Sequence, residues 1–293
     1  MIDVGQGDGL VLRTSGGVTV VIDTGTDSGG AAIARFLKQK AINSVELLIL
    51  THPHADHIGG VPRLLRSVTV KSAWVSGYSA NTRTHVRVLT ELEKHGVATT
   101  QVRRGTRGVL DGNIEINVLG PEDPLISNSR SDANANSIIL WLKHGEIDFL
   151  LTGDAEKETE ERLLRVLRGQ PPTRFEILKV AHHGSRHASS RAFLKRVTPD
   201  VALISCGANN RYKHPHPDTL ERLKTAGTQS FRTDLHGTIR LRSNGERILI
   251  VTDRQGARHP NTSSGKKFGL NVHSSGSSTL RLNNAINRNP DVP

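Results

Sequence analysis

The spacing of hydrophobic residues alternates along the chain between the periods of strands and helices. Short apolar runs predict strands at residues 10–13 and 18–23, joined as a hairpin at Gly16-Gly17. The continuous apolar run at residues 45–50 (VELLIL) is typical of a strand buried on both faces. The following pattern predicts helices at residues 31–40, 61–66 and 84–95 and a strand at residues 70–75.

A second series of strands and helices resembles the first. Strands are predicted at residues 114–119, 138–142, 149–152, 177–180 and 201–205, and helices at residues 157–168, 190–197 and 218–226. Two short strands at residues 239–241 and 248–251 form a final hairpin that turns at Asn244-Gly245. Because strands and helices recur in both halves, we expect an α/β protein with four layers, in which helices cover two packed sheets.

The regular pattern stops after residue 252. Residues 1–252 are therefore predicted to form one folded domain, and residues 253–293 a basic tail rich in Ser, Gly and Asn. This composition is typical of a disordered segment. A spacer without a function of its own is the favoured interpretation, and a tether for nucleic acid is the alternative.

Charge and cysteine content limit the candidate chemistries. The net charge is +11, which favours an anionic partner, although a solvated basic surface explains it about as well. Residues 254–293 contain six Lys or Arg and one Asp, so much of the charge lies in the tail. Cys206 is the one cysteine, which excludes an intramolecular disulfide and a cysteine-based zinc site.

The chain contains no apolar run near the ~20 residues that a membrane-spanning helix needs. Its N-terminus also lacks the basic and apolar regions of a signal peptide. A soluble protein of the cytoplasm is therefore expected.

The densest cluster of metal-binding residue types follows the buried strand at residues 45–50. The segment THPHADHIGG (51–60) contains His52, His54, Asp56 and His57. Imidazole and carboxylate ligands suit Zn²⁺, Mn²⁺ or iron. A loop at a strand end allows His52 and His54 to point to one ion and Asp56 and His57 to a second. A polar turn that collects three histidines by chance is the improbable alternative.

This HxHxDH motif resembles that of the metallo-β-lactamase superfamily. The resemblance implies an αββα metallo-β-lactamase sandwich with further metal ligands at later strand ends. Asp154 is then the carboxylate that bridges both metals, and His182 or His183 the last ligand, with the choice between them left open. Asp23 matches the aspartate that orients the metal-binding histidines or a water molecule.

A closer resemblance is to the hydrolase domain of the competence protein ComEC, which is used in DNA uptake. It rests on six segments between residue 2 and about residue 250: 2–8 (IDVGQGD), 51–60, 150–156 (LLTGDAE), 178–190 (LKVAHHGSRHASS), 214–223 (HPHPDTLERL) and 231–239 (FRTDLHGTI). The resemblance implies a soluble domain standing alone, which cleaves a nucleic acid or nucleotide phosphodiester. The glycine-rich residues 5–8 are interpreted as a tight turn near the metal site.

One segment departs from the superfamily pattern. Many members have a metal-binding histidine between the HxHxDH loop and the bridging aspartate, whereas residues 132–137 read DANANS. One metal would therefore have fewer protein ligands. Asn136 is predicted either to contact a ligand or the substrate, or to cap the turn before the strand at residue 138; both interpretations stay open.

Two later histidines are candidates for catalysis. His214 and His216 lie in a loop stiffened by two prolines, and one of them could bind the phosphate or protonate the leaving oxygen. The alternative is that both are surface or packing residues. Further candidate substrate contacts are Ser185, Lys213 and Arg232.

The expected mechanism uses two divalent metal ions, Zn²⁺ or Mn²⁺, about 3.5–4 Å apart, which share Asp154 and a hydroxide. The hydroxide attacks phosphorus while Asp56 and His57 bind metal and Asp56 orients the nucleophile. The sequence leaves DNA, RNA and small nucleotides open as substrates. Hydrolysis of another bond (a phosphocholine ester, a lactone or a β-lactam) is one alternative, because a fold does not select its chemistry. A non-catalytic binding module supported by metal is the other.

Overall fold

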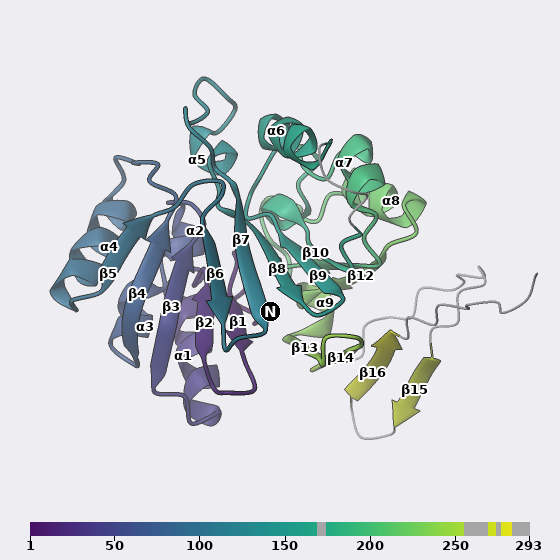
Figure 1. Ribbon diagram of the computed structural model, residues 1–293, viewed down its shortest axis with the longest axis horizontal. Coiled ribbons are helices and arrows are strands. Elements are labelled where there is room, and N and C mark those ends of the chain that lie inside the picture. The colour runs from purple at the N-terminus through teal and green to yellow at the C-terminus, as the bar shows by residue number, and fades with distance from the viewer. Residues whose placement is uncertain (169–173, 255–268, 274–276, 283–293) are drawn as a thin grey trace, which may run out of the picture.

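The computed structural model describes residues 1–168, 174–254, 269–273 and 277–282. Two large sheets lie face to face, and helices cover the outer face of each (Figure 1). This is the four-layer α/β arrangement that the hydrophobic pattern predicts. Within the described ranges, each helix is too short or too polar to cross a bilayer.

The first sheet is built from the N-terminal part of the chain. Its strands lie in the order β1 (Leu10–Arg13), β2 (Thr19–Ile22), β3 (Ser44–Leu50), β4 (Thr69–Val75) and β5 (Ala98–Gln101). β1 is antiparallel to β2, as the predicted hairpin requires, and the other neighbours are parallel. Three helices pack on the outer face: α1 (Asp27–Gln39), α3 (Val61–Leu65) and α4 (Arg83–Lys94).

Alternation along β3 shows why its sequence is continuously apolar. Leu47 and Ile49 pack into the core between the two sheets, whereas Leu48 and Leu50 pack into the core beneath the helices. Successive side chains of a strand point to opposite faces, and both faces of β3 are covered. The run at residues 45–50 therefore has few positions that would favour a polar residue.

The second sheet has the order β12 (Gln229–Arg232), β11 (Val201–Ile204), β10 (Ile177–Lys179), β9 (Ile147–Leu151), β8 (Ile139–His144), β7 (Ile114–Gly120) and β6 (Arg107–Leu110). β9 to β12 run parallel, and β6 to β9 are antiparallel. Side chains from α6 (Lys157–Arg168), α7 (Arg191–Val197) and α8 (Pro217–Thr225) complete the core on its outer face. The short strands β5, β6 and β12 are absent from the predicted elements, because β5, for example, is exposed throughout and has no apolar alternation.

A third, smaller sheet lies at the C-terminal end of the described residues. β13 (Ile239–Ser243) and β14 (Ile248–Thr252) form the hairpin predicted at Asn244-Gly245. Two strands lie within the segment predicted to be disordered, β15 (Gly269–His273) and β16 (Ser277–Leu282), and β16 pairs with β14. The edge of β14 offers unpaired backbone groups that a further strand can satisfy, which the tail composition does not reveal. The other residues of the predicted tail from 255 onward lie outside the described residues.

The candidate metal ligands gather where strands from both sheets end. β3 of the first sheet and β9 and β10 of the second end at the same edge, and the carbonyl of Thr51 accepts a hydrogen bond of 2.9 Å from the backbone N–H of Ile138. α2 (Ala55–Ile58) turns the chain back after His54. The packing of two sheets thus brings together loops that lie more than a hundred residues apart.

Two glycines allow the HxHxDH loop to lie directly against α1. A Cβ atom built on Gly30 would lie 2.6 Å from the Cα atom of Gly60, and a Cβ atom on Gly60 would lie 2.6 Å from the Cα atom of Gly30. Backbone atoms cannot yield as a flexible side chain can. The contact therefore sets the position of α1 relative to the end of the ligand-bearing loop.

We expect Gly30→Ala to lower the free energy of unfolding by about 1–3 kcal/mol, because the added methyl group forces two backbone segments apart. Gly108→Ala is the matched control, since its Cβ atom would meet Trp74 at an ordinary 3.5 Å. Urea unfolding of both variants provides the measurement. Equal stability of the two variants would show that the α1 contact is not tight.

Candidate metal centre

The HxHxDH loop brings its three histidine rings close together. The ring of His52 lies 4.7 Å from that of His54 and 4.0 Å from that of His57, with 3.1 Å between His52 Nε2 and His54 Nδ1. Asp56 and His57 lie one turn later in α2, which returns His57 to the buried interior. His52 is buried as well, and both His52 and His57 face Asp154. The division of the loop between two metal ions stays a prediction.

Asp23 holds the imidazole of His57 from behind. The carboxylate lies 2.8 Å from His57 Nδ1 and accepts hydrogen bonds from the backbone N–H and the hydroxyl of Thr51, at 2.8 and 2.6 Å. Because Nδ1 is engaged, Nε2 is left to point away from Asp23. The structure thus places Asp23 where the sequence predicts an orienting residue.

Asp154 is the buried carboxylate at the centre of the site. Its Oδ1 lies 3.2 Å from Nε2 of His57, and its Oδ2 lies 3.8 Å from Nε2 of His52. Burial opposes ionisation, but the charges on the surrounding histidines, His57 first, hold the pKa of Asp154 well below its ordinary value. A carboxylate between two groups of imidazoles has the position expected of a bridging ligand.

His182 and His183 both face Asp154. Their Nε2 atoms lie 3.8 and 3.6 Å from the same oxygen, Oδ2. Both residues have left-handed backbone, with φ of 48° and 54°, a conformation that costs a non-glycine residue on the order of 1–3 kcal/mol. The tight turn directs two consecutive imidazoles inward. The sequence left open which of the two faces the site, and in the structure both do.

The two imidazoles have different neighbours. His183 Nε2 is 3.4 Å from Oδ2 of Asp56. His182 Nδ1 lies 2.7 Å from Glu156, and its ring lies 5.4 Å from the ring of His214. For the proposal below, we refer to the candidate ligands His52, His54 and His182 as the first ligand group, and to the candidate ligands Asp56, His57 and His183 as the second ligand group.

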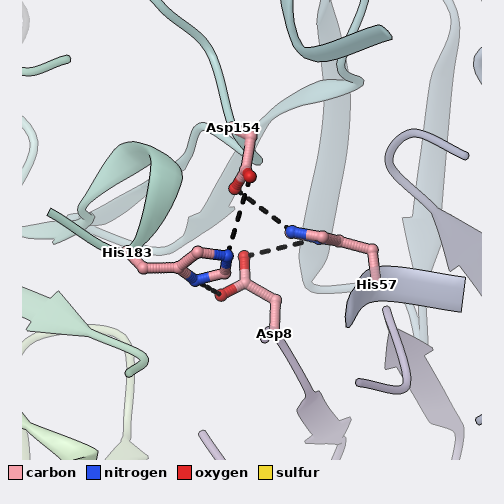
Figure 2. Close-up of side chains that lie close together, drawn as sticks. All are labelled: Asp8, His57, Asp154 and His183. Atoms are coloured by element: carbon pink, nitrogen blue, oxygen red, sulfur yellow. Dashed lines mark ion pairs between the residues drawn. The ribbon is translucent and has the colours of Figure 1, made fainter. Parts of the chain in front are cut away.

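Several buried polar atoms in this cluster have no hydrogen-bond partner. Within the part of the chain that the structure describes, they include Nε2 of His57, Nε2 of His183 and Oδ1 of Asp154. An unpaired buried polar group costs about 1–3 kcal/mol. These atoms converge, and the donors of Asp8, His57, Asp154 and His183 all lie within 4.8 Å of one another (Figure 2). Mixed imidazole and carboxylate donors of this kind fit a divalent transition metal.

Asp8 lies behind the imidazoles of the second ligand group. Its oxygens are 3.3 Å from His183 Nδ1 and 3.9 Å from His57 Nδ1, whereas the Nε2 atoms of both rings face Asp154 (Figure 2). Nδ1 of His183 is engaged by the carbonyl of Ser205, at 3.0 Å, and Nδ1 of His57 by Asp23. Asp8 therefore places a negative charge beside both rings. The sequence assigns residues 5–8 to a turn near the site but does not identify this role.

Lys179 compensates the charge of Asp8. Its ammonium group forms an ion pair with Asp8 and donates a hydrogen bond of 2.9 Å to the carbonyl of Gly153. Burial would raise the pKa of Asp8, but Lys179 and His183 lower it below the ordinary value. The only sequence signal for this ion pair is the position of Lys179 at the end of an otherwise apolar strand. A lysine at such a position is buried, and buried lysines are almost always paired.

Glu156 orients His182. The carboxylate lies 2.7 Å from His182 Nδ1 and accepts a hydrogen bond of 3.0 Å from Nε of Arg130. Burial opposes its charge, but the hydrogen bonds from His182 and Arg130 lower its pKa to about 2. Asn134 also approaches His182, at 3.4 Å.

Asn136, by contrast, has a structural position. Its side chain accepts a hydrogen bond from the backbone N–H of Ile126 and donates to the carbonyls of Ile126 and Asp132. All of these partners are backbone groups of the preceding segment. The structure therefore favours the local turn contact over a contact with a metal ligand or the substrate.

The two histidines of the 214–217 loop differ in position. The His214 ring lies 5.4 Å from the His182 ring, and burial, followed by charge on His182 and His183, lowers its pKa to about 4. His216 caps α8 by accepting a hydrogen bond from the backbone N–H of Asp218, and it also lies 2.8 Å from Arg186. Of the two candidates, His214 is the one beside the ligand groups.

The three residues predicted to contact substrate differ in exposure and in their partners. Lys213 is exposed next to His214. Ser185 is buried, and its hydroxyl accepts a hydrogen bond from the backbone N–H of His187. Arg232 is engaged by the carboxylate of Asp234, with 3.0 Å between Nε and Oδ1. Burial of Ser185 and pairing of Arg232 argue against their predicted roles.

Comparison with known families and proteins agrees with this fold. Residues 2–208 match the metallo-beta-lactamase superfamily, and the chain belongs to that superfamily, most of whose members are metal-dependent hydrolases. It is 34% identical over 262 residues to ComE operon protein 3 of Bacillus subtilis, covering 83% of this chain and 32% of that protein. It is 29% identical over 261 residues to Recombination protein 2 of Haemophilus influenzae, covering 86% of this chain and 30% of that protein. The chain thus spans about a third of the length of these relatives.

Solved structures share the fold at low sequence identity. The diiron β-hydroxylase CmlA of Streptomyces venezuelae matches 78% of this chain and 51% of its own, with a TM-score of 0.53 and 15% identity. YhfI of Bacillus subtilis matches 78% of this chain and 88% of its own, with a TM-score of 0.50 and 13% identity. These likenesses support the fold alone.

Replacing Lys179 with Met leaves the carboxylate of Asp8 buried without its cation. We expect a loss of about 3–5 kcal/mol in the free energy of unfolding. In Asp8→Asn/Lys179→Met both charges are absent, and part of that loss should be recovered. Urea unfolding of both single variants and the double variant measures the coupling; additive losses would contradict a direct pair.

Cys206 supplies a pH-dependent prediction. Burial, reinforced by the nearby Asp234 carboxylate, raises the pKa of the thiol to about 12. The folded protein therefore retains a proton that the unfolded chain loses above a pH of about 8.5, and stability should fall with rising pH by about 1.4 kcal/mol per unit more than in Cys206→Ala. Urea unfolding of both proteins between about pH 9 and 10.5 tests this; parallel curves would contradict it.

Proposed function

We propose that this protein is a metal-dependent phosphodiesterase that cleaves nucleic acid. The observation that carries the proposal is the arrangement of two ligand groups around one buried carboxylate, Asp154. Binuclear sites of this kind suit in-line displacement at phosphorus. The resemblance to competence proteins supports DNA as the polymer.

The proposed ligands follow from the positions of the donor atoms. The first ligand group, with His182 in place of the histidine missing from residues 132–137, would hold one ion. The second ligand group would hold the other, and Asp154 would bridge them. Zn²⁺ or Mn²⁺ bound there would lower the pKa of a water molecule and offset the charge of the phosphoryl oxygens.

Other side chains prepare this chemistry. The Ser205 carbonyl, Asp23 and Glu156 engage Nδ1 of His183, His57 and His182, respectively, so that each Nε2 is directed inward. Asp56 keeps 29% of its side chain exposed, so its carboxylate is placed to accept a hydrogen bond from the attacking water. Neutral His214 is placed to donate a hydrogen bond to a phosphoryl oxygen.

The rim beside His214 supports a nucleic acid over an uncharged substrate. Tyr212 is half exposed and stacks on the His214 ring, with 5.7 Å between centroids. The guanidinium of Arg211 lies 4.8 Å from the centroid of the Tyr212 ring, and Lys213 follows. Aromatic rings beside cations bind bases and phosphates together.

We expect the protein loaded with Mn²⁺ or Zn²⁺ to cleave single-stranded DNA or plasmid DNA, and to hydrolyse bis-p-nitrophenyl phosphate. His182→Ala and His183→Ala should each reduce the rate by at least ~100-fold, because loss of groups that merely support metal ligands already costs 10–100-fold. Elemental analysis should find about one metal ion fewer in each variant. RNA in the same assay identifies the preferred polymer.

His95→Ala is the matched control, because this histidine lies at the end of α4 and bonds only to the neighbouring helix turn among the described residues. It should retain activity and metal content. Normal metal content in His182→Ala would overturn its assignment as a ligand. Two bound ions without cleavage of any phosphodiester would instead favour another bond or a binding role.

A further inference from the structure

A cleft of about 540 Å³ lies between the start of α6, the loop at residues 185–190 and α8. Its volume falls within the ~300–1,000 Å³ typical of ligand sites. Two carboxylates, Glu156 and Glu158, lie among its lining residues. The cationic side chains that line it are more numerous: Arg130, Lys157, Arg186, Arg191 and Arg222.

The local carboxylates leave part of this positive charge uncompensated. Glu156 is already engaged by Arg130 and His182. The ion-pair partner of Lys157, Glu161, is distant, at 3.9 Å across one helical turn. Arg191 is exposed at the start of α7. The cleft therefore presents a net positive surface to a ligand.

Arg222 is held rigidly at the floor of the cleft. Its guanidinium donates hydrogen bonds of 2.8 and 2.9 Å to the carbonyls of Ala188 and Ser189. Burial lowers its pKa, and the neighbouring Arg191 lowers it further although Glu160 opposes this shift. The repulsion between Arg222 and Arg191 would be relieved by a bound anion, so the pair favours anion binding.

The cleft lies next to the metal centre. Glu156 lines it and also contacts Nδ1 of His182. On the other wall, Arg186 follows His183 by three residues and lies 2.8 Å from Nε2 of His216. One side chain, Glu156, thus separates a ligand in the cleft from His182.

We propose that this cleft binds backbone phosphates of a single-stranded polynucleotide, adjacent to the phosphodiester that is cleaved. The inference rests on the proposed function and specifies its substrate as a polymer rather than a small nucleotide. Arginine and lysine suit phosphate oxygens through charge and hydrogen bonds. A single strand can follow a cationic groove at many sequences.

The test variant is Lys157→Glu/Arg191→Glu. Lys157 and Arg191 are the first residues of α6 and α7, where a carboxylate favours the helix through its dipole. Both helices should therefore persist. The matched control, Arg35→Glu/Lys38→Glu, makes the same change in charge at exposed positions of α1, which covers the other sheet.

Binding is measured by fluorescence anisotropy with a labelled single-stranded DNA of about 20 nucleotides. We expect Kd to rise at least ~10-fold in the test variant at moderate salt. The slope of log K against log salt should decrease by roughly 1.4, or ~0.7 for each phosphate that the variant no longer neutralises. The control variant should stay within about twofold of the unaltered protein. Circular dichroism verifies that all three are folded.

Equal weakening in the test and control variants would overturn the proposal, because it would show a general effect of charge. Unchanged binding in the test variant would overturn it as well. Hydrolysis of bis-p-nitrophenyl phosphate by the unaltered protein tests the proposed function separately. If the test variant alone lost DNA binding while the unaltered protein cleaved no phosphodiester, the proposed binding cleft would be supported and the proposed nuclease activity rejected.

Discussion

The site depends on the buried carboxylate of Asp154, whose negative charge is stable only beside hydrogen-bond donors and positive charge. Asp154 is nearly inaccessible to water, and imidazoles from two loops surround it. Burying a charge without partners is strongly unfavourable. The two sheets, the loops at their edge and the turn at residues 181–184 are therefore constrained to bring those donors to one place.

A layer of orienting groups surrounds the donors and shares this constraint. Asp23 and Glu156 engage Nδ1 of His57 and His182, and Asp8 lies behind His57 and His183. Lys179 then balances Asp8. Each added carboxylate stiffens an imidazole but brings a further buried charge. The strained left-handed backbone of two consecutive histidines is tolerated because this surrounding structure holds it.

Metal chemistry and polymer binding meet in one short segment. Residues 182–191 supply two imidazoles to the cluster and two arginines to the basic cleft. The same segment is tied to α8 by the hydrogen bonds of Arg222. Because one segment serves both purposes, positive charge is concentrated beside the ligand groups although the folded part of the chain has only a modest excess of positive charge.

Local patterns determined the class of this protein. Apolar runs such as residues 45–50, the hairpin turn at Asn244-Gly245 and the HxHxDH loop each depend on neighbours in the sequence, so the four layers and the approximate position of the site could be predicted. Only the tertiary structure decided which side chains converge. Four features depend on backbone geometry or on partners far along the chain: the inward direction of both His182 and His183, the Asp8–Lys179 ion pair, the position of Asn136 and the strand pairing of β16. The physical reason is that charge, hydrogen bonding and sheet-edge pairing act through space rather than along the sequence.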